Sequence, residues 1–353
     1  MKQPFRVPTS TATACVPANG AVAEASDDLI HLEPTYRLHL TVYLTLTEVA
    51  MHRYVVTFIF LLCLPATLLS AEPIRVFVTV LPQQTFVEQI GGEHVQVEAL
   101  VNAGSNPHAY EPTPGQMARL AQADLYFRIG LPIEAAWMER IRAVNPTLRV
   151  VDLSNGIARR RLEAHDHDHE DQHAHEHEHQ TEAEIEPDPH IWMSPLLVIR
   201  LTEQIALTLS EWDPAHAADY QARLMQTSAE LNALDAEIRA QLDVLQHRRL
   251  MVYHPAWGYF ADAYGLTQIP IESEGKEPGP RYLAALIKQA RRDRVRVILA
   301  QPQLSTKAAQ QVAREIGGRV AVIDTLSADY IGSLRHLVQV LTAVDSSQLD
   351  TGR

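Results

Sequence analysis

The stretch Ile74-Arg-Val-Phe-Val-Thr-Val-Leu-Pro-Gln-Gln-Thr-Phe-Val-Glu-Gln-Ile90 joins a β-branched and aromatic run directly to an amphipathic segment. Ile74–Val80 has the composition of a buried strand, and Gln83–Ile90 has the residue spacing of a helix. A strand that leads within a few residues into a helix is the unit of α/β folds with parallel sheets. The sequence on either side shows how often this unit repeats.

The unit recurs in two sets, which predicts an α/β protein of two lobes, each with a mostly parallel sheet flanked by helices. The first set has strands at Ile74–Val80, Val95–Leu100, Asp124–Ile129 and Arg149–Asp152, and helices at Gln83–Ile90, Pro114–Gln122 and Ile133–Val144. The second has strands at Leu250–Tyr253, Thr267–Ile271, Val295–Ala300 and Arg319–Ile323, and helices at Pro255–Ala263, Arg281–Arg291, Ser305–Ile316 and Tyr330–Val344.

A long helical segment separates the two sets. Pro195–Leu209 is apolar and periodic, and Asp213-Pro214 is typical of a helix cap followed by a first-turn proline. The helix that opens there is expected to run to about Gln246, and one helix of this segment is expected to join the lobes. The predicted domains are an N-terminal lobe over 72–193, a helical linker over 194–246 and a C-terminal lobe over 247–353.

The N-terminal region has the pattern of an export signal. A short basic start at Met51-His52-Arg53 precedes an apolar run that is too short to span a membrane, and Ser70-Ala71 supplies small residues for cleavage. We therefore predict a signal peptide over 51–71 and a periplasmic protein, with 1–50 as a mis-assigned or disordered extension. The alternative is a genuine N-terminal extension with an internal membrane anchor.

Charge and cysteine content exclude two classes of partner and site. The formal net charge of the chain is -13, whereas nucleic-acid binding requires clustered Lys and Arg. The two cysteines, Cys15 and Cys63, both precede the predicted mature chain, so we expect no disulfide framework and no thiolate metal site.

A histidine-rich, acidic tract interrupts the first lobe at 163–186. Its seven histidines alternate mostly with Asp and Glu, and they are His165, His167, His169, His173, His175, His177 and His179. Such a composition buries too little apolar surface to fold, so the tract is expected to be a disordered loop. Imidazoles and carboxylates together favour weak, multi-site collection of divalent metals. The alternative is a solvated linker that tolerates histidines.

Three further histidines stand singly in proline-containing turns. His108 follows Pro107, His190 follows Pro189, and His254 precedes Pro255 at the end of a predicted strand. Proline restricts the loop and lowers the entropy lost when the side chain is fixed. Ligands in open α/β sheets bind beyond the carboxyl ends of strands, which suits His108 and His254. Each histidine taken alone could equally be a surface or capping residue.

Four motifs give the chain a resemblance to the metal-binding solute receptors of ABC importers, especially the zinc-uptake branch. They are Asn-Pro-His-Ala-Tyr-Glu-Pro-Thr-Pro at 106–114, Asp-Pro-His-Ile-Trp-Met-Ser-Pro at 188–195, His-Pro-Ala-Trp-Gly-Tyr-Phe-Ala-Asp-Ala-Tyr-Gly-Leu at 254–266 and Glu-Ser-Glu-Gly-Lys-Glu-Pro at 272–278. The acidic histidine tract is also typical of that branch. The resemblance extends from about Ile74 to Val344.

This resemblance implies two lobes joined by a long rigid helix, with the metal in the cleft between them. It implies that His108 and His190 ligate from the first lobe and His254 from the second. The family's acidic fourth ligand falls on Asp324, while Glu111 or water is the alternative. The chain departs from the family pattern at Gln301-Pro-Gln303, where an acidic residue often stands.

Three imidazoles with a carboxylate or water suit tetrahedral Zn²⁺, whereas manganese favours more oxygen ligands. The predicted function is a monomeric, non-enzymatic zinc receptor that delivers Zn²⁺ to the membrane permease of an ABC importer. The alternatives are a receptor for manganese or another divalent metal, a periplasmic zinc hydrolase and a metal buffer. Because each ligand histidine must be neutral, zinc binding is expected to weaken near pH 6.5 and below.

Overall fold

The computed structural model describes residues 51, 53, 72–162, 187–272 and 276–350. The chain divides into the units 1–70 and 71–353, and all elements named below belong to the second unit. The predicted extension 1–50, most of the predicted signal peptide 51–71 and the histidine-rich tract 163–186 lie outside the described residues. Among the helices that are described, none is both long and apolar enough to cross a membrane.

The first lobe is built on a parallel sheet in the order β2-β1-β3-β4. Its strands are β1 (Ile74–Val78), β2 (Val95–Ala99), β3 (Leu125–Arg128) and β4 (Arg149–Asp152). The helices between them are α2 (Leu81–Gly91), α3 (Pro114–Leu120) and α4 (Pro132–Val144). Thr113 begins α3 by accepting a hydrogen bond from the backbone N–H of Gln116, as a helix cap should.

The second lobe repeats this topology with a parallel sheet in the order β6-β5-β7-β8. Its strands are β5 (Arg249–Val252), β6 (Thr267–Pro270), β7 (Val297–Ala300) and β8 (Arg319–Val322). Its helices are α7 (Gly258–Tyr264), α8 (Pro280–Arg292), α9 (Lys307–Ile316) and α10 (Tyr330–Asp350). Every residue of β7 is buried, as expected for a strand covered on both faces.

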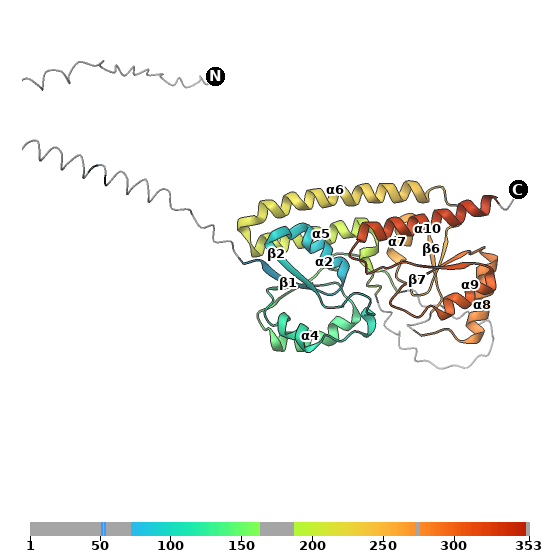
Figure 1. Cartoon of the computed structure of the whole chain (residues 1–353), viewed down its shortest axis with the longest axis horizontal. Coiled ribbons are helices and arrows are strands. Elements are labelled where there is room, and N and C mark those ends of the chain that lie inside the picture. Colours follow the sequence, from blue (N-terminus) through green and yellow to red (C-terminus); the bar gives the residue numbers. More distant parts are fainter. Residues whose placement is uncertain (1–50, 52, 54–71, 163–186, 273–275, 351–353) are drawn as a thin grey trace, which may run out of the picture. The chain divides into compact units, whose positions relative to one another are not determined.

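Two long helices connect the lobes along one side of the molecule (Figure 1). They are α5 (Pro195–Trp212) and α6 (Ala217–Leu242), which pack against each other. Helix α6 also packs against α2 of the first lobe and α10 of the second. The Phe86 ring meets the Tyr330 ring edge-on at 5.0 Å, which joins α2 to α10. These contacts bring both sheets under one helical layer.

The predicted two-lobe α/β fold is confirmed, and all eight predicted strands are present. Two predicted helix starts are wrong. Pro214 lies in a short 3-10 helix, Pro214–His216, and α6 begins only at Ala217 and ends at Leu242 rather than near Gln246. Likewise α7 begins at Gly258 and not at Pro255. Proline fixes φ in a range that a 3-10 helix or a turn also uses, so it does not by itself mark an α-helix.

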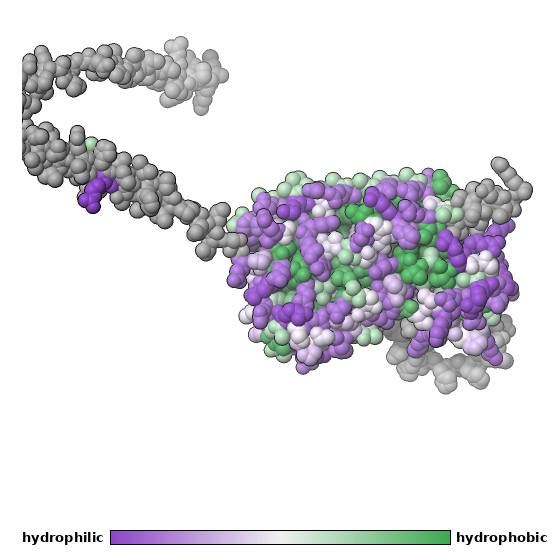
Figure 2. Space-filling model, in the orientation of Figure 1, coloured by the Kyte–Doolittle hydropathy of each residue, from purple (hydrophilic) through white to green (hydrophobic). Residues whose placement is uncertain are grey.

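Hydrophobic side chains from both lobes and from α5, α6 and α10 form the larger of two buried clusters. Burial of each large aliphatic side chain contributes about 1.5–3 kcal/mol, so this shared core stabilises both lobes together. The face of the molecule drawn in Figure 2 is mostly hydrophilic, with hydrophobic residues in scattered patches.

Candidate metal centre

Three histidines from separate parts of the sequence meet between the two lobes. His108 lies in the 3-10 helix Pro107–Ala109, in the loop that follows β2. His190 precedes the 3-10 helix Ile191–Met193 that leads into α5, and His254 follows β5. One ring nitrogen from each lies within 4.8 Å of the others. The structure therefore brings together the three single histidines that the sequence selected.

The spacing of two of these imidazoles matches that of zinc ligands. The Nε2 atoms of His190 and His254 are 3.3 Å apart. Two nitrogen ligands at about 2.0–2.1 Å from a tetrahedral zinc ion are themselves about 3.3–3.4 Å apart. The His108 ring lies 4.8 Å from the His254 ring and 5.9 Å from the His190 ring, measured between centroids. His108 is thus placed to supply the third nitrogen.

Two buried carboxylates fix the tautomers of two of these candidate ligands. Nδ1 of His190 is 2.8 Å from Oδ1 of Asp188, and Nδ1 of His254 is 2.5 Å from Oε1 of Glu272. A carboxylate oxygen accepts a hydrogen bond from Nδ1–H. Nε2 is then the unprotonated nitrogen and carries the free lone pair. Both lone pairs therefore face the space between the rings. This carboxylate–histidine arrangement is the one that orients imidazoles toward a metal.

The polypeptide holds this group rigidly from both lobes. The backbone N–H of His190 donates to Oδ1 of Asp188 at 2.9 Å, and the backbone N–H of His108 donates to Oδ1 of Asn106 at 3.0 Å. Next to His190, Nε1 of Trp192 donates to the carbonyl of Thr325 in the second lobe at 2.8 Å. These bonds reduce the freedom that the ligands would lose on metal binding.

Burial changes the protonation of two ligands. Burial, together with the charges of the neighbouring His254 and His190, lowers the pKa of His108 to about 3. Burial also lowers the pKa of His190, although Asp188 acts in the opposite direction. His190 is only 3% exposed, whereas His108 is an exposed residue. Solvent therefore screens the interactions of His108 more than those of His190. These two imidazoles are therefore expected to stay neutral to a lower pH than an ordinary histidine.

The cavity at the histidines is small. Its volume is about 20 Å³, and its walls include Gln301, Gln303 and Leu304 besides the histidines. A space of that size accommodates one small species such as a water molecule or a single ion. The two glutamines occupy the positions where the resemblance led us to note missing acidic residues, so they leave this wall uncharged.

The two predicted acidic ligands make other contacts in this structure, and Asp324 does so beside the cavity. Oδ1 of Asp324 accepts hydrogen bonds from Nε2 of Gln303 at 2.7 Å and from the backbone N–H of Leu326 at 2.9 Å. Glu111 forms an exposed ion pair with Arg140 at 3.0 Å. Neither carboxylate belongs to the group formed by the three histidines. In this structure Asp324 caps the end of β8, and its role as a ligand stays a prediction.

Sequence reasoning missed the roles of Asp188 and Glu272. Both residues lie inside the motifs that carried the family resemblance, and Asp188 precedes His190 by two positions. An acidic residue so close to a candidate ligand, across a proline, is the signal that could have identified it. No such local signal exists for Glu272, because the chain brings it to His254 only through the pairing of β5 with β6.

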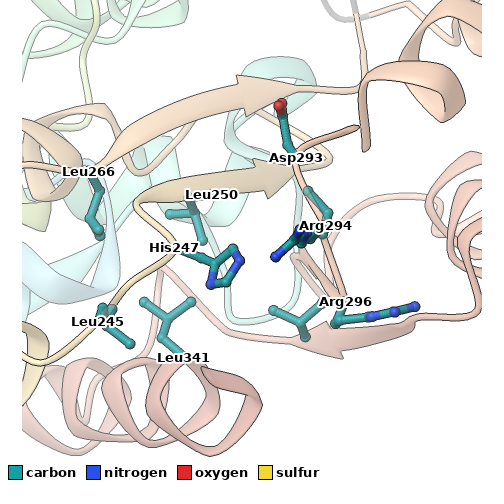
Figure 3. Close-up of a pocket in the computed structure, with 10 residues that line it drawn as sticks. Leu245, His247, Leu250, Leu266, Asp293, Arg294, Arg296 and Leu341 are labelled. Atoms are coloured by element: carbon teal, nitrogen blue, oxygen red, sulfur yellow. The ribbon is translucent and has the colours of Figure 1, made fainter. Parts of the chain in front are cut away.

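A larger cavity, of about 50 Å³, lies at the other end of the second sheet (Figure 3). His247 and Arg294 line it together with leucine side chains, among them Leu250 at the amino end of β5. His254 stands at the carboxyl end of the same strand. Because the strands are parallel, the two ends lie on opposite edges of the sheet, and this cavity is separate from the metal centre.

Comparison with known proteins gives a consistent result. Residues 76–344 match the family described as zinc-uptake complex component A, periplasmic. The high-affinity zinc uptake system protein ZnuA of Bacillus subtilis (strain 168) is 32% identical over 266 residues, which are 73% of this chain and 80% of that protein. The zinc-binding protein AdcA of Streptococcus pyogenes serotype M3 (strain MGAS315) is 29% identical, and the chain spans only 51% of its length.

Solved structures agree with these sequence matches. A crystal structure of ZnuA superposes with a TM-score of 0.71 at 38% sequence identity, covering 78% of this chain and 100% of that one. The match therefore extends over both lobes.

Proposed function

Since the chain belongs to the family of periplasmic zinc-uptake components and so serves as a zinc receptor for an ABC importer, we propose that His108, His190 and His254 ligate the transported Zn²⁺. The observation that carries this proposal is the 3.3 Å separation between the Nε2 atoms of His190 and His254. It equals the separation of two nitrogen ligands on a tetrahedral zinc ion, about 3.3 Å.

The donor set favours zinc over metals that prefer oxygen. Three neutral imidazoles suit zinc, while manganese favours carboxylate, carbonyl and water ligands. Asp188 and Glu272 are engaged with the Nδ1 atoms of two of the histidines, so they increase the basicity of the imidazoles rather than ligate. We propose that water completes the tetrahedron in the arrangement described.

The family is one of substrate-binding transport components and not of enzymes. The proposed water ligand would make the site formally similar to that of a zinc hydrolase, which was the alternative class. Such an enzyme needs a general base beside the water. The amide side chains of Gln301 and Gln303 on the cavity wall cannot act as a base, which supports the transport role.

Each step in the capture and transfer of Zn²⁺ can be assigned to a segment of the chain. We propose that the signal peptide 51–71 exports the chain, that the tract 163–186 collects Zn²⁺ weakly, and that the centre between the lobes 72–193 and 247–353 holds one ion tightly. The helices of 194–246 join those lobes. The receptor works as a monomer and presents its ion to the membrane permease of the importer.

Removal of the tract tests where the tight site lies. Zinc titrations of the mature chain and of a variant lacking 163–186 are expected to differ in stoichiometry, because the tract binds additional ions weakly. One tight site should remain in both proteins, and isothermal titration calorimetry with a competing chelator can count it. If the deletion removed all tight binding, the principal site would belong to the tract and the proposal would fail.

Asp324→Ala tests the fourth position. Since the Asp324 carboxylate is bonded to Gln303 and Leu326, we expect the substitution to change zinc affinity by less than about 10-fold and to lower stability by about 1 kcal/mol, the usual effect of a lost hydrogen bond. Chelator competition and thermal unfolding measure the two effects. A loss of affinity as large as that of a ligand histidine would instead make Asp324 the fourth ligand.

A further inference from the structure

The two chain segments that flank the tract 163–186 are joined at a short stem beside the metal centre. Arg161 and Pro187 form an isolated antiparallel bridge, and the backbone N–H of Asp188 donates to the carbonyl of Arg160 at 2.9 Å. His190 follows the stem after one proline. The stem therefore restrains the position of His190, a proposed metal ligand.

Asp188 is the central residue of this stem. It is 1% exposed, and its Oδ1 atom accepts from both the ring and the backbone of His190. Its other carboxylate oxygen, Oδ2, faces Nε of Arg160 at 4.0 Å. A buried carboxylate is costly unless a cation and hydrogen bonds compensate its charge. Arg160 supplies that cation from a side chain that is 16% exposed.

The same arginine contacts the second lobe. Nη1 of Arg160 is 3.3 Å from Oδ1 of Asp262 in α7. The hydroxyl of Tyr259, also in α7, accepts from the backbone N–H of Arg160 at 3.0 Å and donates to the carbonyl of Asp188 at 3.0 Å. Helix α7 begins four residues after His254, so these bonds fix the segment that carries that ligand.

Gly258 lies where α7 packs closely against Arg160 and Asp188 of the stem. A Cβ atom at this position would lie 2.4 Å from Nη1 of Arg160 and 2.8 Å from Oδ2 of Asp188. Both distances are far below a van der Waals contact. A side chain at the start of α7 would therefore displace the guanidinium or the carboxylate from its present position.

We infer that Arg160 is a positioning residue for the metal centre, one that holds His190 through Asp188 and His254 through α7. It sets the two Nε2 atoms at the separation that zinc needs. This inference rests on the proposed three-histidine site. It adds the residue that holds two ligands from different lobes at a fixed separation. In this inference the guanidinium acts on the two proposed ligands through Asp188 and α7.

The test compares Arg160→Gln with Arg160→Lys in the full mature chain. Loss of a partner in the outer shell of a metal site typically weakens binding 10- to 100-fold, and we expect a loss in this range for Arg160→Gln. Lysine keeps the charge beside Asp188 but not the planar fork, so partial recovery of zinc affinity is expected. Co²⁺ serves as the spectroscopic probe, because its visible absorption should change with the ligand geometry.

Arg335→Gln is the matched control. Arg335 pairs with Glu237 on α6 at 2.8 Å, away from the stem, and its loss should affect stability without altering zinc affinity or the Co²⁺ spectrum. If Arg160→Gln behaved like this control, with affinity and spectrum unchanged, Arg160 would be an ordinary ion-pair residue and the inference would be overturned.

Tyr259→Phe covers the case in which Arg160→Gln does not fold. It removes the hydroxyl that bonds both Asp188 and Arg160 while keeping the ring, and it should weaken zinc binding and alter the Co²⁺ spectrum in the same direction. Unchanged affinity and spectrum in a folded Tyr259→Phe protein would count against the inference. Failure of the three-histidine site itself would be seen separately, as a zinc affinity that His254→Ala leaves unchanged.

Discussion

His254→Ala is expected to lower zinc affinity by about 100- to 1000-fold. Structural zinc sites with about four ligands bind with roughly 10–16 kcal/mol, so one ligand accounts for about 3–4 kcal/mol. The substitution also leaves the Glu272 carboxylate, which is 6% exposed, without the imidazole that donates to it. An isolated buried charge is unfavourable, so the remaining ligands would be less well held.

Competition with a chelator of known zinc affinity measures this loss, because the chelator also suppresses weak binding by the tract. His336→Ala is a suitable control, since His336 is an exposed histidine on α10. Its substitution removes one imidazole from the chain but none from the centre, and the affinity should stay within about 2-fold of wild type, the scatter of ordinary surface changes. Equal losses in the two variants would contradict the assigned ligand set.

The sequence predicted the fold well because the fold depends on local patterns. Ile74–Val80 and Val295–Ala300 are apolar runs of strand length, and each is followed by a segment with helical spacing. The ends of elements were less accurate. Pro214 and Pro255 suit the start of a helix, but the tertiary structure placed one in a 3-10 helix and the other in a turn.

The metal centre could be predicted only in part, for a physical reason. His108, His190 and His254 stood out because proline-containing turns surround each of them. The residues that orient these ligands depend on contacts made across the fold. Glu272 reaches His254 only because β6 lies beside β5 in the sheet. Family resemblance selected Asp324 at the end of a strand; its carboxylate bonds Gln303, which lines the cavity, and its role as a ligand stays a prediction.

The second large effect is that zinc affinity should resist acid more than three ordinary histidines would allow. At pH 5, protons compete with the metal and lower affinity about 30-fold for each imidazole of ordinary pKa, or about 3 × 10⁴-fold for three. The lowered pKa of His108, at about 3, removes one of these factors, and the lowered pKa of His190 reduces another. The loss should therefore be at least about 30-fold smaller.

Stability of the metal-free protein should fall over the same range of pH. In the unfolded chain His108 and His190 take up protons below about pH 6.5, whereas in the folded chain their lowered pKa keeps them neutral. Their contribution is therefore fully present above pH 6.5 and is lost as the pH falls toward the folded-state values. Thermal unfolding of the metal-free chain should show a falling Tm between pH 6.5 and 5.

Together, the two measurements distinguish zinc binding at the buried centre from zinc binding by a solvent-exposed chelating loop. A plot of log zinc affinity against pH, with the chelator calibrated at each pH, should have a slope of two or less below pH 6.5. A slope of three would mean that all three ligands titrate as free imidazoles, and the metal would then be bound by histidines in water. The predicted combination is an affinity that falls less than three free imidazoles would allow while metal-free stability also falls, and it requires ligands whose pKa the fold itself lowers.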